Sequence, residues 1–266
     1  MKIITWNVNW IRAVGKKGFK EFVEEQNPDI LCIQETKAFE DQFLKDKNLW
    51  ELEWYKYIWH RGERAGYAWT VIFYKNEIEV IDTKNDFGEI EHFHNDWRVT
   101  ELEFKYKWEH IVLLNGYFPN GGTRADGTEM VSYKLDFYNH LIAYTRRLKT
   151  EWKQTIVTWD FNICHTEIDI ARPKQNVNSI WFLPIEREKI WEYINDWNFD
   201  VFRYFYPDQL DTYSWWSYRA WARPRNVWWR IDYFVVNKEF EKYLEDIEYM
   251  TDIMGSDHCP VVLTLK

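Results

Sequence analysis

The sequence is short of glycine, cysteine and proline. Its 266 residues include 10 Gly, 3 Cys and 7 Pro, against 18 Trp, whereas Gly alone usually makes up about 7% of a globular chain. Cys32, Cys164 and Cys259 share no Cys-x-x-Cys spacing and lie in or beside apolar runs. This spacing argues against a disulfide framework or a cysteine-rich zinc site, and we expect buried, reduced thiols.

Two kinds of segment are also missing. No apolar run reaches the 18 residues of a membrane span, and the amino terminus begins in strand-like sequence rather than in a basic, apolar leader. No linker rich in Pro, Gly or Ser divides the chain. We therefore expect a cytoplasmic protein without a membrane span, with one domain over residues 1–266.

Positive charge is in the minority, because 34 Lys and Arg stand against 43 Asp and Glu, which gives a net charge of −9. That balance argues weakly against a nucleic-acid partner, since phosphates attract cations. Residues 213–231 are an exception: they contain no acidic residue, and their arginines alternate with aromatic side chains. This mixture favours binding of phosphates and stacking on sugars or bases; a solvated arginine loop is the alternative.

Short apolar runs rich in β-branched residues predict strands, and segments with apolar residues three or four positions apart predict helices. The predicted strands are residues 3–5, 30–33, 70–74, 111–114, 155–158, 231–236 and 261–265, and the predicted helices include residues 19–23 and 135–148. Strands that alternate with helices, without a linker, predict an α/β fold.

Two of the predicted strands resemble each other. Residues 3–9 read Ile-Ile-Thr-Trp-Asn-Val-Asn, and residues 156–162 read Ile-Val-Thr-Trp-Asp-Phe-Asn. Two similar halves of a fold would give such a match, with each half delivering polar side chains from the end of a central strand.

Polar side chains follow most of the predicted strands, where a rigid strand opens into a loop. They are Asn7 and Asn9, Glu35, Tyr117 and Asn120, Asp160 and Asn162; Asp257 and His258 come just before the last strand. Asp232 lies inside an apolar strand, where a carboxylate is costly unless it is paired, and a buried Asp often orients a His. Together they predict oxygen ligands for a hard metal such as magnesium, beside an Asp–His pair.

Eight motifs in a fixed order carry a family resemblance. They occupy residues 6–9 (WNVN), 34–36 (QET), 115–120 (NGYFPN), 160–169 (DFNICHTEID), 171–174 (ARPK), 213–219 (YSWWSYR), 229–233 (WRIDY) and 255–260 (GSDHCP). On these motifs the chain resembles the exonuclease III family of abasic-site endonucleases, from residue 3 to residue 265. The resemblance implies a four-layered α/β sandwich, in which two packed mixed β-sheets are flanked by helices.

The resemblance also implies a DNA phosphodiesterase that depends on Mg²⁺ or Mn²⁺. It would cut 5′ to an abasic site and leave a 3′ hydroxyl, with 3′→5′ exonuclease and 3′-phosphatase activity. The implied metal site contains Asn7, Glu35, Asp160, Asn162, Asp257 and His258, and the implied catalytic residues are Tyr117, Asp160, Asn162, Asp232 and His258. Either Asp160 or an ionised Tyr117 would supply the nucleophile, and both alternatives stay open.

The implied partner is double-stranded DNA with abasic sites or 3′ ends, bound by a monomer. By position, Trp215, Trp229 and Ile231 would line a pocket for a flipped-out sugar. Further DNA contacts would come from Asn120, Arg172, Lys174, Arg219 and Arg225. Two other functions are considered: a lipid or inositol phosphodiesterase of the same superfamily, and a family member that binds DNA but turns over poorly.

Tryptophans at positions where the family has glycine suggest poor turnover. Where the family has Gly, this chain has Trp10, Trp54, Trp69, Trp97, Trp159, Trp181, Trp197 and Trp228, with Trp108, Trp152 and Trp221 as further candidates. Glycine permits positive φ or close backbone approach, and an indole in its place should overpack at about 1–3 kcal/mol each. One hypothesis is that the natural gene encodes glycine with UGA codons that were translated as Trp. UGG codons at Trp10, Trp159 and Trp228 would contradict it.

Overall fold

The structure, a computed structural model, describes residues 1–46, 49, 54–60, 69–85, 98–217 and 222–266. Of the residues singled out above, Trp97, Arg219 and Trp221 lie outside the described residues. The predictions made for them are therefore not tested.

The described residues form two mixed β-sheets of six strands each. The first has the order β11 (Leu244–Tyr249), β12 (Val261–Leu265), β1 (Lys2–Asn7), β2 (Ile30–Gln34), β4 (Thr70–Lys75), β3 (Tyr55–Trp59). The second has the order β5 (Val80–Lys84), β6 (Val99–Tyr106), β7 (Glu109–Tyr117), β8 (Gln154–Asp160), β10 (Asp232–Asn237), β9 (Asn198–Asp200). All seven predicted strands are confirmed, and β3, β5, β6, β9 and β11 were not predicted.

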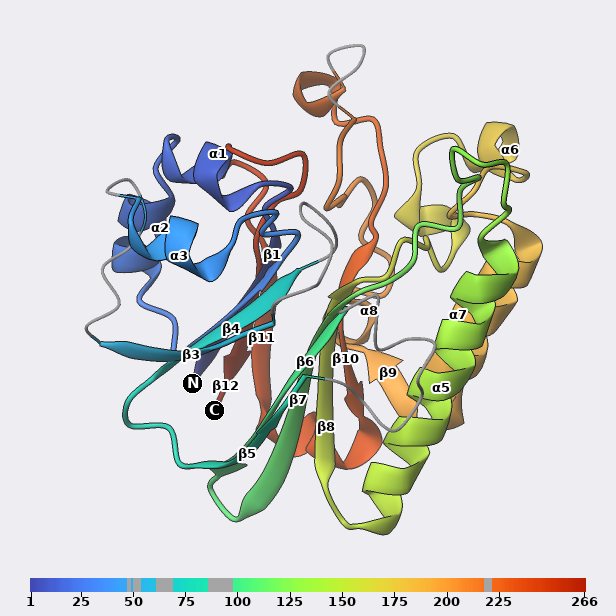
Figure 1. Cartoon of the computed structure of the whole chain (residues 1–266). Coiled ribbons are helices and arrows are strands. Elements are labelled where there is room, and N and C mark those ends of the chain that lie inside the picture. The colour runs from blue at the N-terminus through green and yellow to red at the C-terminus, as the bar shows by residue number, and fades with distance from the viewer. Residues whose placement is uncertain (47–48, 50–53, 61–68, 86–97, 218–221) are drawn as a thin grey trace.

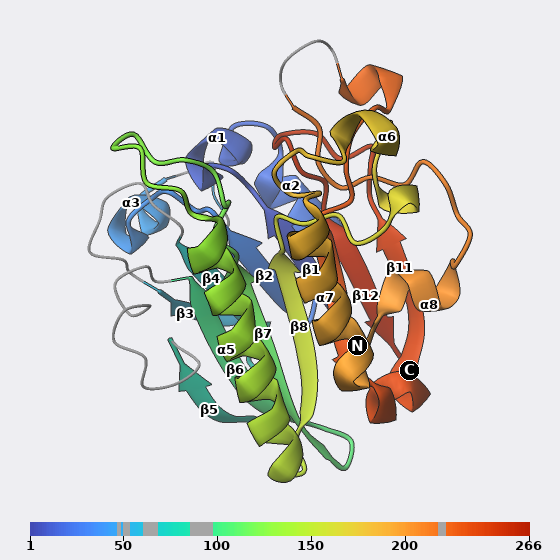
Figure 2. The same cartoon turned by 90° about the vertical axis from the view of Figure 1, so that its right-hand side faces the viewer.

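Helices cover the outer faces of both sheets, as Figures 1 and 2 show. Helices α1 (Ile11–Gly15), α2 (Phe19–Gln26) and α3 (Glu40–Leu44) lie on the first sheet, and the long α5 (Val131–Thr150) and α7 (Pro184–Trp197) lie side by side on the second. The short elements η1 (Glu167–Asp169), α6 (Pro173–Asn176), α8 (Val201–Phe205), η3 (Arg223–Arg225) and η4 (Lys238–Tyr243) occupy the connections. The predicted four-layered α/β sandwich is confirmed.

Three apolar clusters explain why the layers pack. Ile3 of β1 lies in the cluster between the two sheets together with Leu113 of β7. The next residue, Ile4, lies in the cluster under the first helical layer with Phe22 of α2, and Val157 of β8 packs beneath α5 and α7. Because successive side chains of a strand point to opposite faces and both faces are buried, these strands read as continuous apolar runs.

The two sheets repeat one pairing pattern. β1 pairs parallel with β2 and antiparallel with β12, while β8 pairs parallel with β7 and antiparallel with β10. The sequence match between residues 3–9 and 156–162 therefore marks equivalent central strands of two like halves. Asn7 ends β1 and Asp160 ends β8, so each sheet delivers a polar side chain from the same position.

Two expectations based on absences can be compared with the structure. Cys32, Cys164 and Cys259 are buried and free, as expected, and burial raises the pKa of the Cys32 thiol. In the described part of the chain, no helix is both long and apolar enough to cross a bilayer.

The tryptophans that replace family glycines fall into distinct environments. Trp10 and Trp181 have φ angles of 148° and 78°, in the region that favours glycine. Trp54 is 71% exposed, so it displaces no neighbour and the expected overpacking does not apply there. Trp159 is fully buried, and a Cβ placed on Gly116 would come within 2.3 Å of its ring. The indole at 159 is thus accommodated because the facing strand has glycine.

A buried ion network supports the segment that precedes β10. The guanidinium of Arg230 is fully buried and contacts Asp169 at 2.8 Å and Asp200 at 2.5 Å. Burial alone would raise the pKa of Asp169, but Arg230 and Arg203 outweigh it and hold that pKa well below its usual range. The pair therefore stabilises the folded state at neutral pH, and this contribution is lost as the pH falls below about 4.

We expect Asp169→Asn to lower the free energy of unfolding by about 3 kcal/mol at pH 7, because it leaves a buried guanidinium with one partner fewer. Urea unfolding at pH 7 and pH 3.5 measures this, and the variant should lose less stability than the parent between the two. Asp196→Asn, which removes a surface pair with Arg146, is the control and should cost less than about 1 kcal/mol. Equal losses for the two variants would contradict the account.

Candidate active site

Side chains from both sheets meet at the ends of the central strands. Asn7 at the end of β1 donates its amide to Glu35 Oε1 at 2.9 Å and to Asp160 Oδ2 at 2.9 Å. Glu35 directly follows β2, and Asp160 ends β8 in the other sheet. Asn7 and Asp160 are buried, so this bridge holds two carboxylates in a fixed relation across the sheet interface.

An aspartate–histidine pair stands beside the carboxylates. His258 Nδ1 lies 2.8 Å from Asp232 Oδ2, and its Nε2 lies 3.8 Å from Asp160 Oδ2. Asp232 is directly opposite Asp160 in the antiparallel pairing of β10 with β8. The predicted association of Asp232 with His258 is therefore present, and the free side of the imidazole faces Asp160.

Charge and burial shift the pKa values of this group strongly. Burial raises the pKa of Asp160 to about 8, with His258 opposing the shift and the charges of Asp232 and Glu35 adding to it. Burial alone would lower the pKa of His258, but Asp232 outweighs it and raises that pKa to about 10. Burial, Glu35 and Asp160 raise the pKa of Tyr117 well above its usual value. At neutral pH, His258 is thus protonated and Tyr117 is neutral.

The oxygen donors suit a hard divalent cation. The Lys37 ammonium forms an ion pair with Glu35 and donates to Asn9 Oδ1 at 2.5 Å, so this spot already attracts a cation. Asn9 also donates to Asp257 Oδ1 at 2.9 Å, which links Asp257 to the Glu35 side of the site. Potential ligand atoms of Asp160, Asp232 and His258 also lie within 4.8 Å of one another. However, His258 and Asp232 already form a hydrogen bond with each other.

The two asparagines act here as hydrogen-bond donors. Asn7 presents its amide nitrogen to both carboxylates, while its oxygen accepts from the backbone N–H of Asn9 at 2.9 Å. Asn162 donates its amide to the carbonyl of Phe118 at 3.0 Å, and its backbone N–H donates to Asp160 Oδ1 at 2.9 Å. Their predicted contribution of metal ligands stays a prediction, and in this structure they orient the carboxylates.

Backbone conformation marks the same region. Asn9, Glu35, Lys37 and Asn162 have φ angles between 46° and 52°, which is uncommon for residues other than glycine. Such conformations concentrate at functional sites, where the surrounding structure holds them. Asn9 is one of the polar residues predicted after the first strand, whereas Lys37, which directly follows the motif that carries Glu35, was not predicted as a site residue.

The described residues among the predicted DNA contacts are accessible to solvent. Arg172, Lys174 and Arg225 are exposed, and Arg172 and Arg225 line a hollow of about 470 Å³. Asn120 is exposed as well, and its carbonyl accepts from Trp181 Nε1 at 2.9 Å. The arrangement brings Arg172, which directly precedes α6, and Arg225 of η3 to a common hollow.

The predicted sugar-pocket walls also come together. Trp229 and Ile231 belong to one apolar cluster, against which Trp215 packs. Trp215 Nε1 donates to Asp257 Oδ2 at 3.1 Å, so this wall touches a predicted metal ligand. Ile231 is fully buried and Trp229 is 8% exposed, which leaves little of either wall open.

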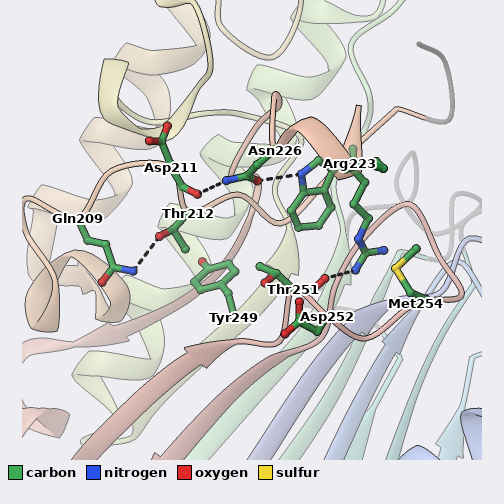
Figure 3. Close-up of a pocket in the computed structure, with 11 residues that line it drawn as sticks. Gln209, Asp211, Thr212, Arg223, Asn226, Tyr249, Thr251, Asp252 and Met254 are labelled. Carbon is green, nitrogen blue, oxygen red and sulfur yellow. Dashed lines mark hydrogen bonds between the residues drawn. The ribbon is translucent and has the colours of Figure 1, made fainter. Parts of the chain in front are cut away.

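Arg223 fastens the loop that carries Asp257. Its Nη1 donates to the carbonyl of Ser256 at 3.0 Å, and its Nη2 donates to the carbonyls of Thr251 and Ile253 at 2.8 and 2.5 Å. Figure 3 shows Arg223 reaching across a pocket of about 500 Å³ toward Thr251. The guanidinium also lies over the Trp216 ring, so it joins Trp216 to the loop before β12.

We expect Arg223→Gln to raise the metal concentration needed for half-maximal activity by about 10-fold or more, because Asp257 is a predicted metal ligand and loss of a residue that supports a ligand typically costs this much. The reason is that Asp257 follows the loop that Arg223 holds at three carbonyls. Titration of activity with Mg²⁺ measures the effect. Arg146→Gln, on the surface of α5, should leave the titration unchanged; an equal shift in both variants would contradict the role of Arg223.

Comparisons with known proteins identify the family of this chain. A family model described as the endonuclease/exonuclease/phosphatase family matches residues 4–258. The chain is 38% identical over 270 residues to an exodeoxyribonuclease of Bacillus subtilis, covering 100% of both chains. It is 36% identical over 264 residues to a DNA-(apurinic or apyrimidinic site) endonuclease of Dictyostelium discoideum, covering 98% of this chain and 69% of that protein.

A comparison with solved structures indicates the same family. The AP endonuclease LMAP from Leishmania major superimposes with a TM-score of 0.86 at 28% identity, covering 98% of this chain and 86% of that one. A family match over nearly the whole chain, a relative that is covered over its full length and a shared fold all indicate the same family. The chain therefore belongs to the endonuclease/exonuclease/phosphatase family.

Proposed function

We propose that this chain is a metal-dependent DNA phosphodiesterase that cuts 5′ to abasic sites and also removes nucleotides and phosphates from 3′ ends. The observation that carries the proposal is the meeting of Glu35 and Asp160 through Asn7, beside the Asp232–His258 pair. The names of the relatives from Bacillus subtilis and Dictyostelium discoideum support DNA as the substrate.

Mg²⁺ is the proposed cofactor, and Mn²⁺ is an alternative. Glu35 and Asp257, with Asn7, Asp160 and Asn162 around them, are the candidate residues to hold it. His258 was also a predicted ligand, but both ring nitrogens of a protonated imidazole are donors, so we assign His258 to the phosphate instead. Carboxylate oxygens with room for water suit these ions. When bound, the ion supplies positive charge to a phosphate oxygen.

The side chains themselves have separate tasks. A protonated His258, oriented by Asp232 at 2.8 Å, donates to a phosphate oxygen and so offsets the charge that develops there. An ionised Asp160 accepts the proton of the attacking water. The raised pKa of Tyr117 favours Asp160 over an ionised tyrosine as the base, and Tyr117 then donates a hydrogen bond to the phosphate.

The proposal extends to the partner and the setting. The proposed contacts to double-stranded DNA are Asn120, Arg172, Lys174, Arg219 and Arg225. The proposed walls of the sugar pocket are Trp215, Trp229 and Ile231. We further propose a monomer, with a single domain over residues 1–266, that works in the cytoplasm. The exposed arginines around the hollow beside α6 support a backbone contact.

A duplex with one abasic site and a labelled 5′ end tests the proposed reaction. With Mg²⁺ we expect a shortened labelled strand that ends in a 3′ hydroxyl, and with EDTA no product. Sphingomyelin and inositol phosphates are tested in parallel, because the same superfamily contains enzymes for them. Hydrolysis of those substrates with intact DNA would overturn the proposal.

A further inference from the structure

A buried ion pair lies against the loops that carry two predicted site residues. Lys134, in the first turn of α5, and Glu186, in the first turn of α7, are both fully buried. Lys134 Nζ lies 2.6 Å from Glu186 Oε1. Because removing two charges from water is costly, a buried ion pair often adds little to stability. A role other than stability is therefore sought in what else the ammonium contacts.

The three N–H groups of the ammonium have three oxygen acceptors. Besides Glu186, Lys134 Nζ donates to the carbonyl of Asn162 at 2.7 Å and to the carbonyl of Asn120 at 3.4 Å. Asn162 follows β8, and Asn120 follows the neighbouring strand β7. One side chain of α5 thus ties the loops after two adjacent strands to α7.

The contact with Asn162 also fixes the turn that holds Asp160. Asn162 has a φ of 50°, which is uncommon for a residue other than glycine. Its backbone N–H donates to Asp160 Oδ1 at 2.9 Å, while its carbonyl accepts from Lys134. Because the backbone dihedral angles of Asn162 set the direction of its N–H relative to its carbonyl, holding the carbonyl also holds the N–H that orients the carboxylate.

Two further contacts agree with this arrangement. Tyr138, one turn further along α5, donates its hydroxyl to the carbonyl of Phe161 at 3.0 Å, so α5 holds two successive carbonyls of the turn after β8. Gly121 has a φ of 85°, and a Cβ placed on it would come within 3.1 Å of Lys134 Cδ. Glycine therefore lets the loop after β7 lie directly against the lysine side chain.

We infer that Lys134 is a positioning residue for the reaction. Its ammonium holds the turn from Asp160 to Asn162 in the conformation that directs the Asp160 carboxylate toward the attacking water, and Glu186 holds the ammonium in place and balances its charge. Lys134 is fully buried and acts through Asn162 rather than on the substrate. The inference rests on the proposed function, in which Asp160 is the base.

Lys134→Met tests the inference, because it keeps an unbranched side chain and removes the three donors. With Mg²⁺ and saturating 3′-phosphate DNA, we expect the single-turnover rate to fall by about 10- to 100-fold, the usual effect of losing a group that orients a functional side chain. The DNA concentration that gives the half-maximal rate should change less, since Arg172, Lys174 and Arg225 are unaltered.

A second measurement follows the turn itself without turnover. In EDTA, hydrogen exchange of a peptide that contains residues 160–164 should be faster in Lys134→Met than in the parent, because the turn opens more often when its carbonyl is released. Unchanged exchange in this peptide would overturn the inference.

Tyr144→Phe is the matched control on the same helix. Tyr144 is buried and its hydroxyl donates to Glu101 of β6, so this variant also removes a buried polar contact of α5, but not one with the loops after β7 and β8. It should leave the rate and the exchange of residues 160–164 unchanged. An equal change in both variants would overturn the role of Lys134.

A double variant keeps the test valid if Lys134→Met alone does not fold. Lys134→Met combined with Glu186→Gln leaves no unpaired charge at this place, and the amide oxygen can still accept from the N–H of Leu183, as Glu186 Oε2 does at 3.1 Å. The double variant should fold and show the same loss of rate. A folded double variant that releases phosphate at the rate of the parent would overturn the inference.

Failure of the proposed function gives a different result. If the parent releases no phosphate from a 3′ end with Mg²⁺, the proposed phosphodiesterase is wrong. Hydrogen exchange in EDTA still decides whether Lys134 holds the turn after β8, since that measurement needs no substrate.

Discussion

Asp160→Asn is expected to lower the rate of phosphate release from a 3′ end by about 10²- to 10⁴-fold, the usual contribution of a positioned general base. Asp160 is buried, accepts from Asn7 at 2.9 Å and faces His258 Nε2 at 3.8 Å. The amide has nearly the same shape but cannot accept the proton of the attacking water. Single-turnover rates at saturating Mg²⁺ measure the loss.

The pH dependence gives a second readout for this residue. Because the pKa of Asp160 is raised to about 8, the carboxylate is mostly protonated below that pH in the absence of a cation, and activity should rise with pH. A nearby divalent cation favours the ionised form, so a higher Mg²⁺ concentration should move the acid limb to lower pH.

A matched control separates catalysis from folding. Asp136→Asn changes an exposed carboxylate on α5 and should leave the rate and the pH profile unchanged. A loss of less than about 10-fold in Asp160→Asn, below the usual range for a general base, would contradict the proposed role of Asp160.

Trp159→Gly is expected to destabilise the fold by about 3–5 kcal/mol, the usual cost of removing a large buried aromatic side chain. The ring of Trp159 is fully buried. Its centroid lies 4.4 Å from the ring centroid of Phe118 and 5.9 Å from those of Phe137 and Phe161. Glycine would leave a cavity between β8 and α5. Urea unfolding gives the change in free energy.

Replacing tryptophan by glycine at residue 10 should instead increase the stability of the fold. Trp10 has a φ of 148° at the start of α1 and is 53% exposed, so Trp10→Gly relieves strain of about 1–3 kcal/mol and removes little packing. A Trp159→Gly variant that is as stable as its parent would contradict this account of the core. It would also favour the hypothesis that the natural protein has glycine at residue 159.

Sequence predicted the central strands because they are buried on both faces and therefore read as apolar runs. It did not predict β6, in which Glu101 and Glu103 alternate with apolar residues. Those carboxylates are buried beside Lys84, Lys153 and Tyr144, which lie far away in the chain. Partners that distant cannot be identified from local pattern.

In the site, too, some residues were predictable from local pattern and others were not. Asp232 and His258 were predicted because a carboxylate inside an apolar strand needs a partner, and each motif is visible on its own. Arg223 and Trp181 act through contacts with backbone carbonyls and with rings from other segments. Arginine and tryptophan are compatible with many roles, so only the folded arrangement reveals that Arg223 holds a loop and that Trp181 packs against Trp215 and Trp229.

The central claim is that Glu35 and its neighbours form one metal-dependent phosphodiesterase site. The most direct test measures phosphate release from a 3′-phosphate DNA end as a function of Mg²⁺ concentration, for the parent chain and for Glu35→Gln. The account predicts no release in EDTA, saturation with Mg²⁺ in the parent, and a shift to at least about 10-fold higher Mg²⁺ in the variant. Release that is independent of Mg²⁺, or identical in parent and variant, would contradict it.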